Sequence, residues 1–371
     1  MKVKHSEFFS PQGISEHFFS VCGSCGDDFS SEAAAVLAAY RSALAEYGCS
    51  EASEVLLRLH LSDITNQEPE LKQLLTGRNS FVSITGQPPV AGRIALEAWH
   101  WSGIKSRESS GGALTVKTQN YTAVWFQQEK IDASGSYQQT AAEFSALQHC
   151  LDKYGATVAD HTLRTWLYCR DVDNNYAGLV KARNEYFTAI GLTPQTHFIA
   201  STGIEGQHPD VSRLVKMDSL NYPGIAPEQT EYVSAPEMLS PTALYGVSFE
   251  RGSRLLFGDR SHCFISGTAS IDKAGNVVHP GDVKKQTLRM LDNIEALLAN
   301  AQSSLQDIKS ATLYLRDIAD APHVTAIVTG RIGENIPLVI LKAPVCRPAW
   351  LVEMECVAVN ERGDRRFAAL R

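Results

Sequence analysis

The sequence predicts an α/β fold built from three copies of one sheet-and-helix unit. Two observations predict it, and the first is a recurring helix. Segments with apolar residues at three- and four-residue spacing begin at Ser30, Tyr137 and Asp282 in the 371-residue chain. The first two end at Gly48 and Gly155, which suits the residue that follows a helix, and Asp282 suits an N-cap.

The second observation is the order of segments after each of these helices. A β-rich run ends in an aspartate, at Asp63, Asp171 and Asp317, and a second helical segment and two more strands follow it. This order is typical of a small sheet covered on one face by two helices. Because the other face of each sheet also needs a partner, we expect a monomer in which the three units pack as an intramolecular pseudo-trimer.

The same order sets the expected domain boundaries. We expect a divergent, structural N-terminal unit at 1–105, a central unit at 112–225 and a C-terminal unit at 243–371. The stretch 221–243 contains four prolines, which predict a linker or long loop and not a central strand. The Ser- and Gly-rich stretch 101–112 is the other expected junction.

Composition and charge exclude several classes of protein. A formal net charge of -7 disfavours nucleic acid as a partner, because proteins that bind this polyanion usually present a basic surface. The sequence has neither a signal-peptide pattern nor an eighteen-residue apolar run, so we expect a soluble, cytoplasmic protein without membrane contact. Eight cysteines then indicate reduced thiols. Cys22 and Cys25 form a lone CxxC, and eleven scattered histidines lack ligand spacing, so we expect no metal and no other cofactor.

The C-terminal unit carries the first resemblance to a known family. Its sequence from FISGTASI at 264–271 to LVEMECVAV resembles the Rid superfamily of small trimeric enamine and imine deaminases. Those deaminases hold the substrate carboxylate with an arginine at the start of the penultimate strand. Here that strand reads IPLVILKA, with Leu338 at or beside the position. A guanidinium grips a carboxylate with two parallel bonds, so its loss argues against simple deaminase activity.

A closer resemblance covers residues 112–359 and points to the chorismatases, in their 3-hydroxybenzoate synthase branch. The matching pieces occur in the same order along the chain. They are RTW at 164–166, GLVKAR ending at Arg183, ASTGI at 200–204, YGVSFER ending at Arg251, FISGTASI at 264–271, GDV at 281–283, and CRPAWLVEME from Cys346 to Glu355. The resemblance implies an enzyme that splits chorismate and releases pyruvate.

Chorismate carries two carboxylates, and the resemblance implies residues that hold them. The expected substrate-binding residues are Arg164, Arg183 and Arg251, with weaker expectations for Thr202, Gly203 and Tyr245. Gly203 would let backbone N–H groups approach a carboxylate. The alternatives are interface ion pairs for the arginines, a turn between strands for Thr202 and Gly203, and packing for Tyr245.

Glu353 is the expected proton donor. In WLVEMECVAV alternate residues face opposite sides of the sheet, so Glu353 and Glu355 point the same way, and the resemblance selects Glu353. A carboxylic acid with a raised pKa in a partly apolar pocket is suited to protonate the methylene carbon of the enol ether. The alternative is a strand-edge glutamate paired with a nearby cation.

Two positions bear on the product. Chorismatases that hydrolyse chorismate have alanines where this chain has Gly267 and Cys346, and the 3-hydroxybenzoate branch has Gly and Cys. We expect Gly267 to give room to the substrate ring, and Cys346 to displace water and orient the substrate without acting as a covalent nucleophile. Cys346 could also be a small buried residue. Three other functions stay open: hydrolysis to a dihydroxycyclohexadiene carboxylate, a divergent Rid-type imine deaminase, and a non-catalytic carboxylate sensor.

Overall fold

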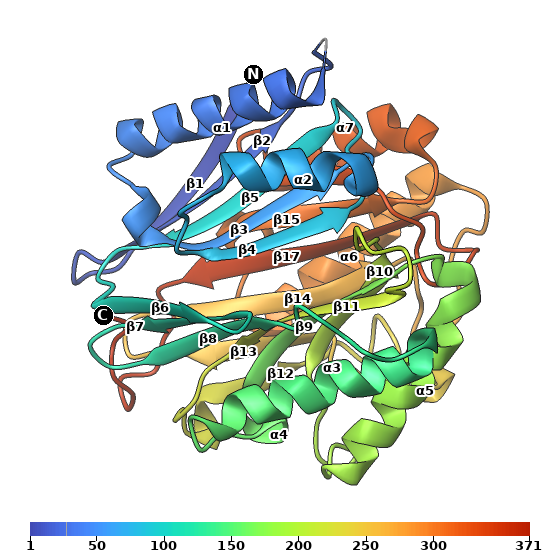
Figure 1. The fold of residues 1–371 in the computed structure, drawn as a ribbon. Helices are drawn as coiled ribbons and strands as arrows, with labels where there is room; N and C mark the ends of the chain where they lie inside the picture. Colours follow the sequence, from blue (N-terminus) through green and yellow to red (C-terminus); the bar gives the residue numbers. More distant parts are fainter. Residues whose placement is uncertain (27) are drawn as a thin grey trace.

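Three sheets, each formed by strands that are consecutive in the sequence, make up the centre of the molecule (Figure 1). The computed structural model describes residues 1–26 and 28–371. The first sheet has the order β1-β2-β5-β3-β4, and α1 and α2 cover its outer face. Its elements are β1 (Val3–Phe9), β2 (Ser15–Cys22), α1 (Phe29–Glu46), β3 (Glu54–Leu61), α2 (Ile64–Leu74), β4 (Phe81–Gly86) and β5 (Ile94–Trp101).

The second sheet has the order β10-β9-β11-β8-β7-β6, with α3 and α5 packed on it. Its elements are β6 (Ser106–Ser110), β7 (Ala113–Lys117), β8 (Thr122–Gln127), α3 (Gly135–Asp152), the short α4 (Val158–His161), β9 (Thr162–Cys169), α5 (Val172–Ala189), β10 (Ala200–Glu205) and β11 (Val215–Asn221).

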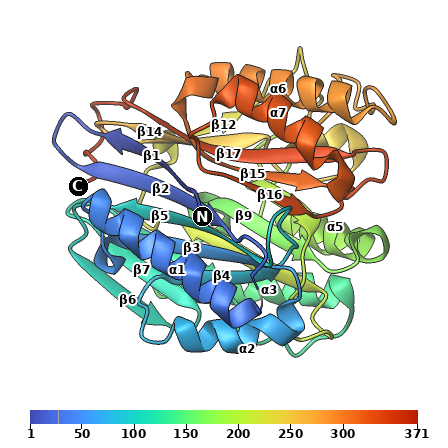
Figure 2. The same ribbon diagram turned by 90° about the horizontal axis from the view of Figure 1, so that it is seen from above.

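The third sheet has the order β12-β13-β14-β17-β15-β16, with α6 and α7 on its outer face (Figure 2). Its elements are β12 (Thr230–Val233), β13 (Gly252–Leu256), β14 (Ser261–Ala269), α6 (Val283–Asn300), β15 (Ile308–Leu315), α7 (Ala321–Ile332), β16 (Leu338–Lys342) and β17 (Val352–Asn360).

The predicted α/β fold with two helices on one face of each sheet is confirmed. The helix ends also follow the sequence signals: the Asp282 side chain accepts from the N–H of Lys285 at the start of α6. Gly48 follows Tyr47, the C-cap residue of α1, and has a φ of +66°, a conformation that favours glycine. The structure describes no helix long and apolar enough to cross a membrane.

Two loop predictions need correction. The Ser- and Gly-rich junction at 101–112 contains β6, which pairs with β7 at the edge of the second sheet. The proline-rich stretch contains β12, an edge strand of the third sheet. In both cases an edge strand needs only one paired neighbour, so polar residues and nearby prolines are tolerated there. The division into units at 1–105, 112–225 and 243–371 stays a prediction.

The inner faces of the three sheets share one core. Trp99 of the first sheet lies 6.0 Å from Trp125 of the second and 6.1 Å from Phe264 of the third, between ring centroids. The strand ends also touch in a cycle. Gly86 at the end of β4 pairs with Gln207, Ile204 of β10 pairs with Val345, and Leu341 of β16 pairs with Pro89. Each sheet therefore supplies the partner that the next one needs.

Glu16 connects the first and third sheets, and its removal provides a test of this packing. Its buried carboxylate accepts from Arg260 Nη1 at 2.7 Å, His262 Nε2 at 2.8 Å and Trp99 Nε1 at 3.0 Å. Glu16→Ala leaves the buried Arg260 without this partner, so we expect a loss of about 3–5 kcal/mol in the free energy of unfolding. Urea denaturation measures it, with the exposed Glu46→Ala as control. Equal midpoints for the two variants would contradict this role of Glu16.

Candidate active site

Glu353 lies on β17, in the middle of the third sheet, and faces a pocket between the third and second sheets. The pocket, called here the Glu353 pocket, is lined by charged, aromatic and small residues from both sheets and from α5. They are Tyr176, Arg183, Ser201, Gly203, Tyr245, Val247, Phe249, Arg251, Gly267, Ala269, Ile271, Cys346, Arg347, Trp350 and Glu353. Seven of the nine residues predicted from the sequence therefore meet here, although they come from distant parts of the chain.

Helix α5 contributes a cation without a protein partner. Arg183 is 1% exposed, and its Nε and Nη2 have no hydrogen-bond partner among the described residues. The guanidinium carbon lies 5.8 Å from the centre of the Phe249 ring. Buried charged groups are normally paired, because an unpaired one costs desolvation energy. The free Nε and Nη2 edge has the geometry that grips a carboxylate with two parallel bonds.

Two further arginines line the same pocket. Arg251 donates from Nε and Nη2 to the carbonyl of Ser240, at 3.2 and 2.8 Å, and its guanidinium lies 5.5 Å from the Tyr245 ring centre. Arg347 donates to the carbonyl of Tyr245 at 3.1 Å. The loop around Tyr245 thus holds both guanidinium groups in place at the pocket wall.

The pocket keeps Glu353 protonated at neutral pH. Burial, followed by the negative charge of Glu355, raises the pKa of Glu353 to about 8, although the positive charges of Arg251 and Arg164 oppose this shift. The side chain is 5% exposed. A carboxyl group in this state can donate a proton, which is the property expected of a general acid.

Gly267 on β14 makes room for this carboxyl group. A Cβ atom at position 267 would overlap Oε1 of Glu353 and lie 2.8 Å from its carboxyl carbon. The Glu353 side chain occupies the space beside Gly267, and the expectation that Gly267 also gives room to the substrate ring stays a prediction. A larger residue at 267 would push the acid away from the strand.

Cys346 faces Glu353 and the hydroxyl group of Tyr176 in the same pocket. Burial, followed by the negative charge of Glu353, raises the pKa of the Cys346 thiol to about 12. The group is therefore a neutral thiol at physiological pH, and a neutral thiol is a poor nucleophile. This agrees with an influence through shape rather than through a covalent bond.

Arg164 and Thr202 lie behind the pocket and contact Glu355. Arg164 Nη2 is 2.7 Å from Glu355 Oε2, and Arg164 Nη1 donates to Ser266 Oγ at 3.2 Å. The Thr202 hydroxyl donates to Glu355 and accepts from the N–H of Gly267 at 2.9 Å. The structure thus gives Arg164 the ion pair that the sequence left as an alternative, and neither side chain lines the Glu353 pocket.

Thr202 and Gly203 are residues of β10, so the alternative of a turn is wrong. The N–H of Ser201 leaves the sheet to reach Ser266 Oγ, and that of Glu205 reaches the carbonyl of Pro344. Backbone groups alternate along a strand, so the N–H of Gly203 points the same way, toward the pocket. A Cβ at 203 would lie 3.0 Å from the Tyr176 ring, so glycine permits this close approach.

Tyr176 and Arg347 also line the pocket, and neither was predicted from the sequence. A signal for Tyr176 was present, since it precedes Arg183 by seven residues and so shares its face of α5. Arg347 follows Cys346 directly, and its direction depends on a loop that no periodicity describes.

Comparisons with known proteins give two levels of similarity. The family model described as endoribonuclease L-PSP matches residues 258–360. A RutC family protein of Pyrococcus abyssi is 33% identical over 99 residues, which are 26% of this chain and 78% of that protein. The 3-aminoacrylate deaminase RutC of Acinetobacter baylyi is 32% identical over 96 residues, which are 26% of this chain and 76% of that protein.

The longer matches concern a different kind of relative. A 3-hydroxybenzoate synthase of Streptomyces hygroscopicus is 25% identical over 250 residues, which are 62% of this chain and 72% of that protein. A chorismatase crystal structure covers 96% of this chain and 99% of its own, with a TM-score of 0.67 at 18% identity, and so shares the fold. The expected resemblances are both confirmed, and the chain belongs to the RutC family.

Proposed function

We propose that this protein is an enzyme that acts on chorismate and converts it to 3-hydroxybenzoate and pyruvate in the Glu353 pocket. The observation that carries the proposal is that one buried site combines a carboxyl group held protonated with a guanidinium group that has no partner among the described residues. The similarity to a 3-hydroxybenzoate synthase and the fold shared with a chorismatase support the choice of substrate.

Binding of the substrate depends first on positive charge in the pocket. Chorismate is a dianion and this chain is acidic, so the pocket must supply local cations. The Nε and Nη2 edge of Arg183 receives one carboxylate, and Arg251 and Arg347 add positive charge in the same pocket. The N–H of Gly203 offers a further donor. These contacts orient the enolpyruvyl group toward Glu353.

The chemical step begins with a proton. Glu353 donates its proton to the methylene carbon of the enol ether, which makes the ether carbon electrophilic. The C4 hydroxyl of the substrate then loses its proton and attacks this carbon, which forms a cyclic ketal. The C4–O bond breaks and the C3 hydrogen leaves as a proton, which makes the ring aromatic. Cleavage of the bond between the former ether carbon and the C3 oxygen then releases 3-hydroxybenzoate and a pyruvate that carries the former C4 oxygen. No water is consumed, since chorismate has the summed composition of 3-hydroxybenzoate and pyruvate.

The surroundings of Glu353 favour this outcome over hydrolysis. Phe249, Trp350 and the Cys346 thiol line the same pocket as the acid, and these side chains offer a nucleophilic water few hydrogen-bond partners. The deaminase alternative finds no support at Leu338, which is buried at the first position of β16 and offers no charge for a carboxylate. We further propose that the protein acts as a monomer in the cytoplasm, because its three sheets already cover one another's inner faces.

Replacement of the acid tests the function. Glu353→Gln keeps the shape of the side chain but removes the proton, so we expect kcat to fall by about 10²–10⁴-fold while chorismate binding is retained. Chromatography of the reaction mixture identifies the product, and the exposed Glu361→Gln serves as control. A diene diol from the wild type would favour hydrolysis, binding without any product would favour the sensor, and full activity of Glu353→Gln would remove Glu353 from the mechanism.

The pH dependence follows from the pKa of Glu353. The protonated form is the active one, and this pKa lies at about 8. Activity should therefore be constant below this value, and kcat/KM should fall about tenfold per pH unit well above it. Initial rates between pH 6 and pH 10 measure the profile. A rate that rises through pH 8 would show that the ionised carboxylate is required, contrary to the proposed role.

Arg183 offers a test that separates binding from folding. Arg183→Met removes a buried charge that has no protein partner, so we expect the free energy of unfolding to stay the same or to rise. Chorismate affinity should fall at least tenfold, because bonds to a charged group contribute about 1.5–3 kcal/mol. Calorimetric titration in the Glu353→Gln background measures binding without turnover, with the exposed Arg366→Met as control. Unchanged affinity together with lower stability would make Arg183 a structural residue.

A further inference from the structure

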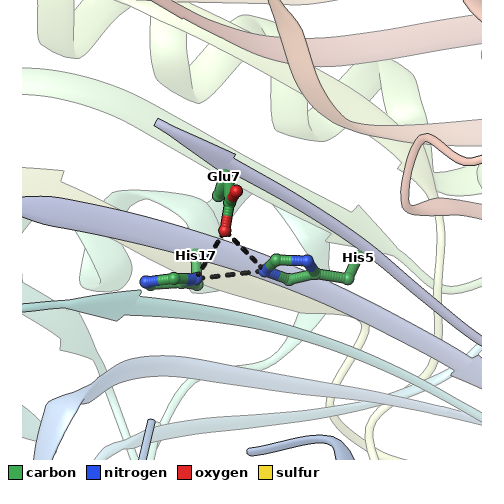
Figure 3. A group of neighbouring side chains, drawn as sticks. All are labelled: His5, Glu7 and His17. Carbon is green, nitrogen blue, oxygen red and sulfur yellow. Dashed lines mark hydrogen bonds and ion pairs between the residues drawn. The ribbon is translucent and has the colours of Figure 1, made fainter. Parts of the chain in front are cut away.

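The hairpin of β1 and β2 brings three potential metal ligands together outside the Glu353 pocket (Figure 3). His5 and Glu7 are two residues apart on β1 and so share a face of the first sheet. His17 on β2 is the direct cross-strand partner of Glu7. The two imidazole rings and the carboxylate therefore converge on one point, as Figure 3 shows.

The three ligand atoms have the spacing of a zinc site. His5 Nε2 is 3.0 Å from His17 Nδ1, and Glu7 Oε2 is 3.9 Å from the first nitrogen and 3.6 Å from the second. A triangle with these sides has a circumradius of about 2 Å, which equals the usual zinc–nitrogen and zinc–oxygen distances. A single ion can thus contact all three atoms without movement of the backbone.

The surrounding residues hold the histidine rings in this arrangement. The His5 ring stacks on Tyr47 with 3.6 Å between ring centres and contacts Phe19 at 4.7 Å. The His17 ring meets the edge of Phe9 at 5.8 Å. In contrast, the Glu7 carboxylate has no hydrogen bond within the part of the chain that the structure describes, and it is 43% exposed. Two ligands are fixed, and the third can close over an ion from the solvent side.

We propose that His5, Glu7 and His17 bind one zinc ion, with a water molecule from the solvent as the fourth ligand. Two imidazoles and one carboxylate suit zinc and disfavour magnesium and calcium, which prefer oxygen ligands. His5 Nε2 and His17 Nδ1 must both be free of hydrogen to bind the ion, so zinc replaces the hydrogen bond between the two rings. The spacing along the sequence did not indicate the site, because His17 reaches it only through strand pairing.

The ion would stabilise an edge of the first sheet. β1 is the outermost strand of the first sheet and is paired on one side only. Its Ser6 hydroxyl donates to the carbonyl of Lys309 at the start of β15, so the hairpin also joins the first sheet to the third. None of the three ligands lines the Glu353 pocket. The ion would therefore act on stability and leave turnover unchanged.

Metal content and melting temperature test the proposal. Protein stripped with a chelator and dialysed against zinc should retain one equivalent of zinc by mass spectrometry, and zinc should raise its melting temperature, because a ligand that binds only the folded state stabilises it. Glu7→Gln should lower zinc affinity at least tenfold, and His5→Phe should do the same while it keeps the ring stacked on Tyr47. Magnesium should have no effect on the wild type.

Two controls make the outcome decisive. Glu46→Gln changes an exposed glutamate elsewhere, and Cys25→Ser removes the exposed thiol of the lone CxxC pair. Both should bind zinc as the wild type does. The proposal is overturned if the wild type retains no zinc, if Glu7→Gln and His5→Phe retain as much as the wild type, or if Cys25→Ser alone loses it.

Discussion

Glu355 and Arg164 form a buried ion pair where the second and third sheets meet, with 2.7 Å between Oε2 and Nη2. Trp166 Nε1 donates to the other carboxylate oxygen at 2.8 Å, and Arg58 of the first sheet lies 3.9 Å from it. All three sheets thus contribute to one set of contacts around Glu355. Removal of one partner from such a pair leaves an uncompensated charge in the core, so the packing of the sheets depends on this pair.

The same pair determines the state of Glu353. The two glutamates are two residues apart on β17 and face the same side of the sheet. Burial is the largest cause of the raised pKa of Glu353, and the negative charge of the ion-paired Glu355 raises it further. Two neighbouring carboxyl groups in different surroundings are a common way to obtain one charged and one protonated acid. Arg164 and Thr202 therefore affect the proposed proton donor through Glu355, even though they do not line its pocket.

The registers of the three sheets show that the position of Glu353 is occupied by a different residue in each sheet. The positions opposite Arg58, Trp166 and Thr312 are all acidic: Glu97, Asp218 and Glu355. The residue two positions earlier differs in each sheet, being Ala95, Lys216 and Glu353. Lys216 Nζ lies 2.9 Å from Asp218 Oδ1 and donates to Ser83 Oγ at 2.6 Å. The repeated fold supplies three equivalent strand positions, and a single side chain decides which of them holds a candidate proton donor.

The sequence predicted the repeated unit because helix and strand periodicities are local properties of the chain. It also brought Glu353, Arg183, Arg251, Gly267 and Cys346 into one predicted site, through a resemblance that preserves their order. The pairing of Arg164 with Glu355, and not with Glu353, could not be predicted from the sequence. Both acids face the same side of β17, and only the packing of β9 and β10 against this strand selects one of them. The edge strands β6 and β12 and the His5–His17 contact were missed for a related reason. Each depends on a pairing between segments whose own composition indicates a loop or no structure in particular.

Arg183 shows how function and stability are balanced in this fold. An unpaired guanidinium that is 1% exposed lowers the stability of the empty protein, and nothing in the packing of α5 requires a charge there. An acidic protein that binds a dianion needs such a group, because long-range attraction is absent and the favourable interaction must come from short, desolvated contacts. The many paired charges elsewhere in the core, such as Glu16 with Arg260 and Glu355 with Arg164, allow the fold to tolerate this cost at one place. Pairing with an anion in the pocket removes this cost, so the interaction of Arg183 with its ligand adds to the free energy of binding.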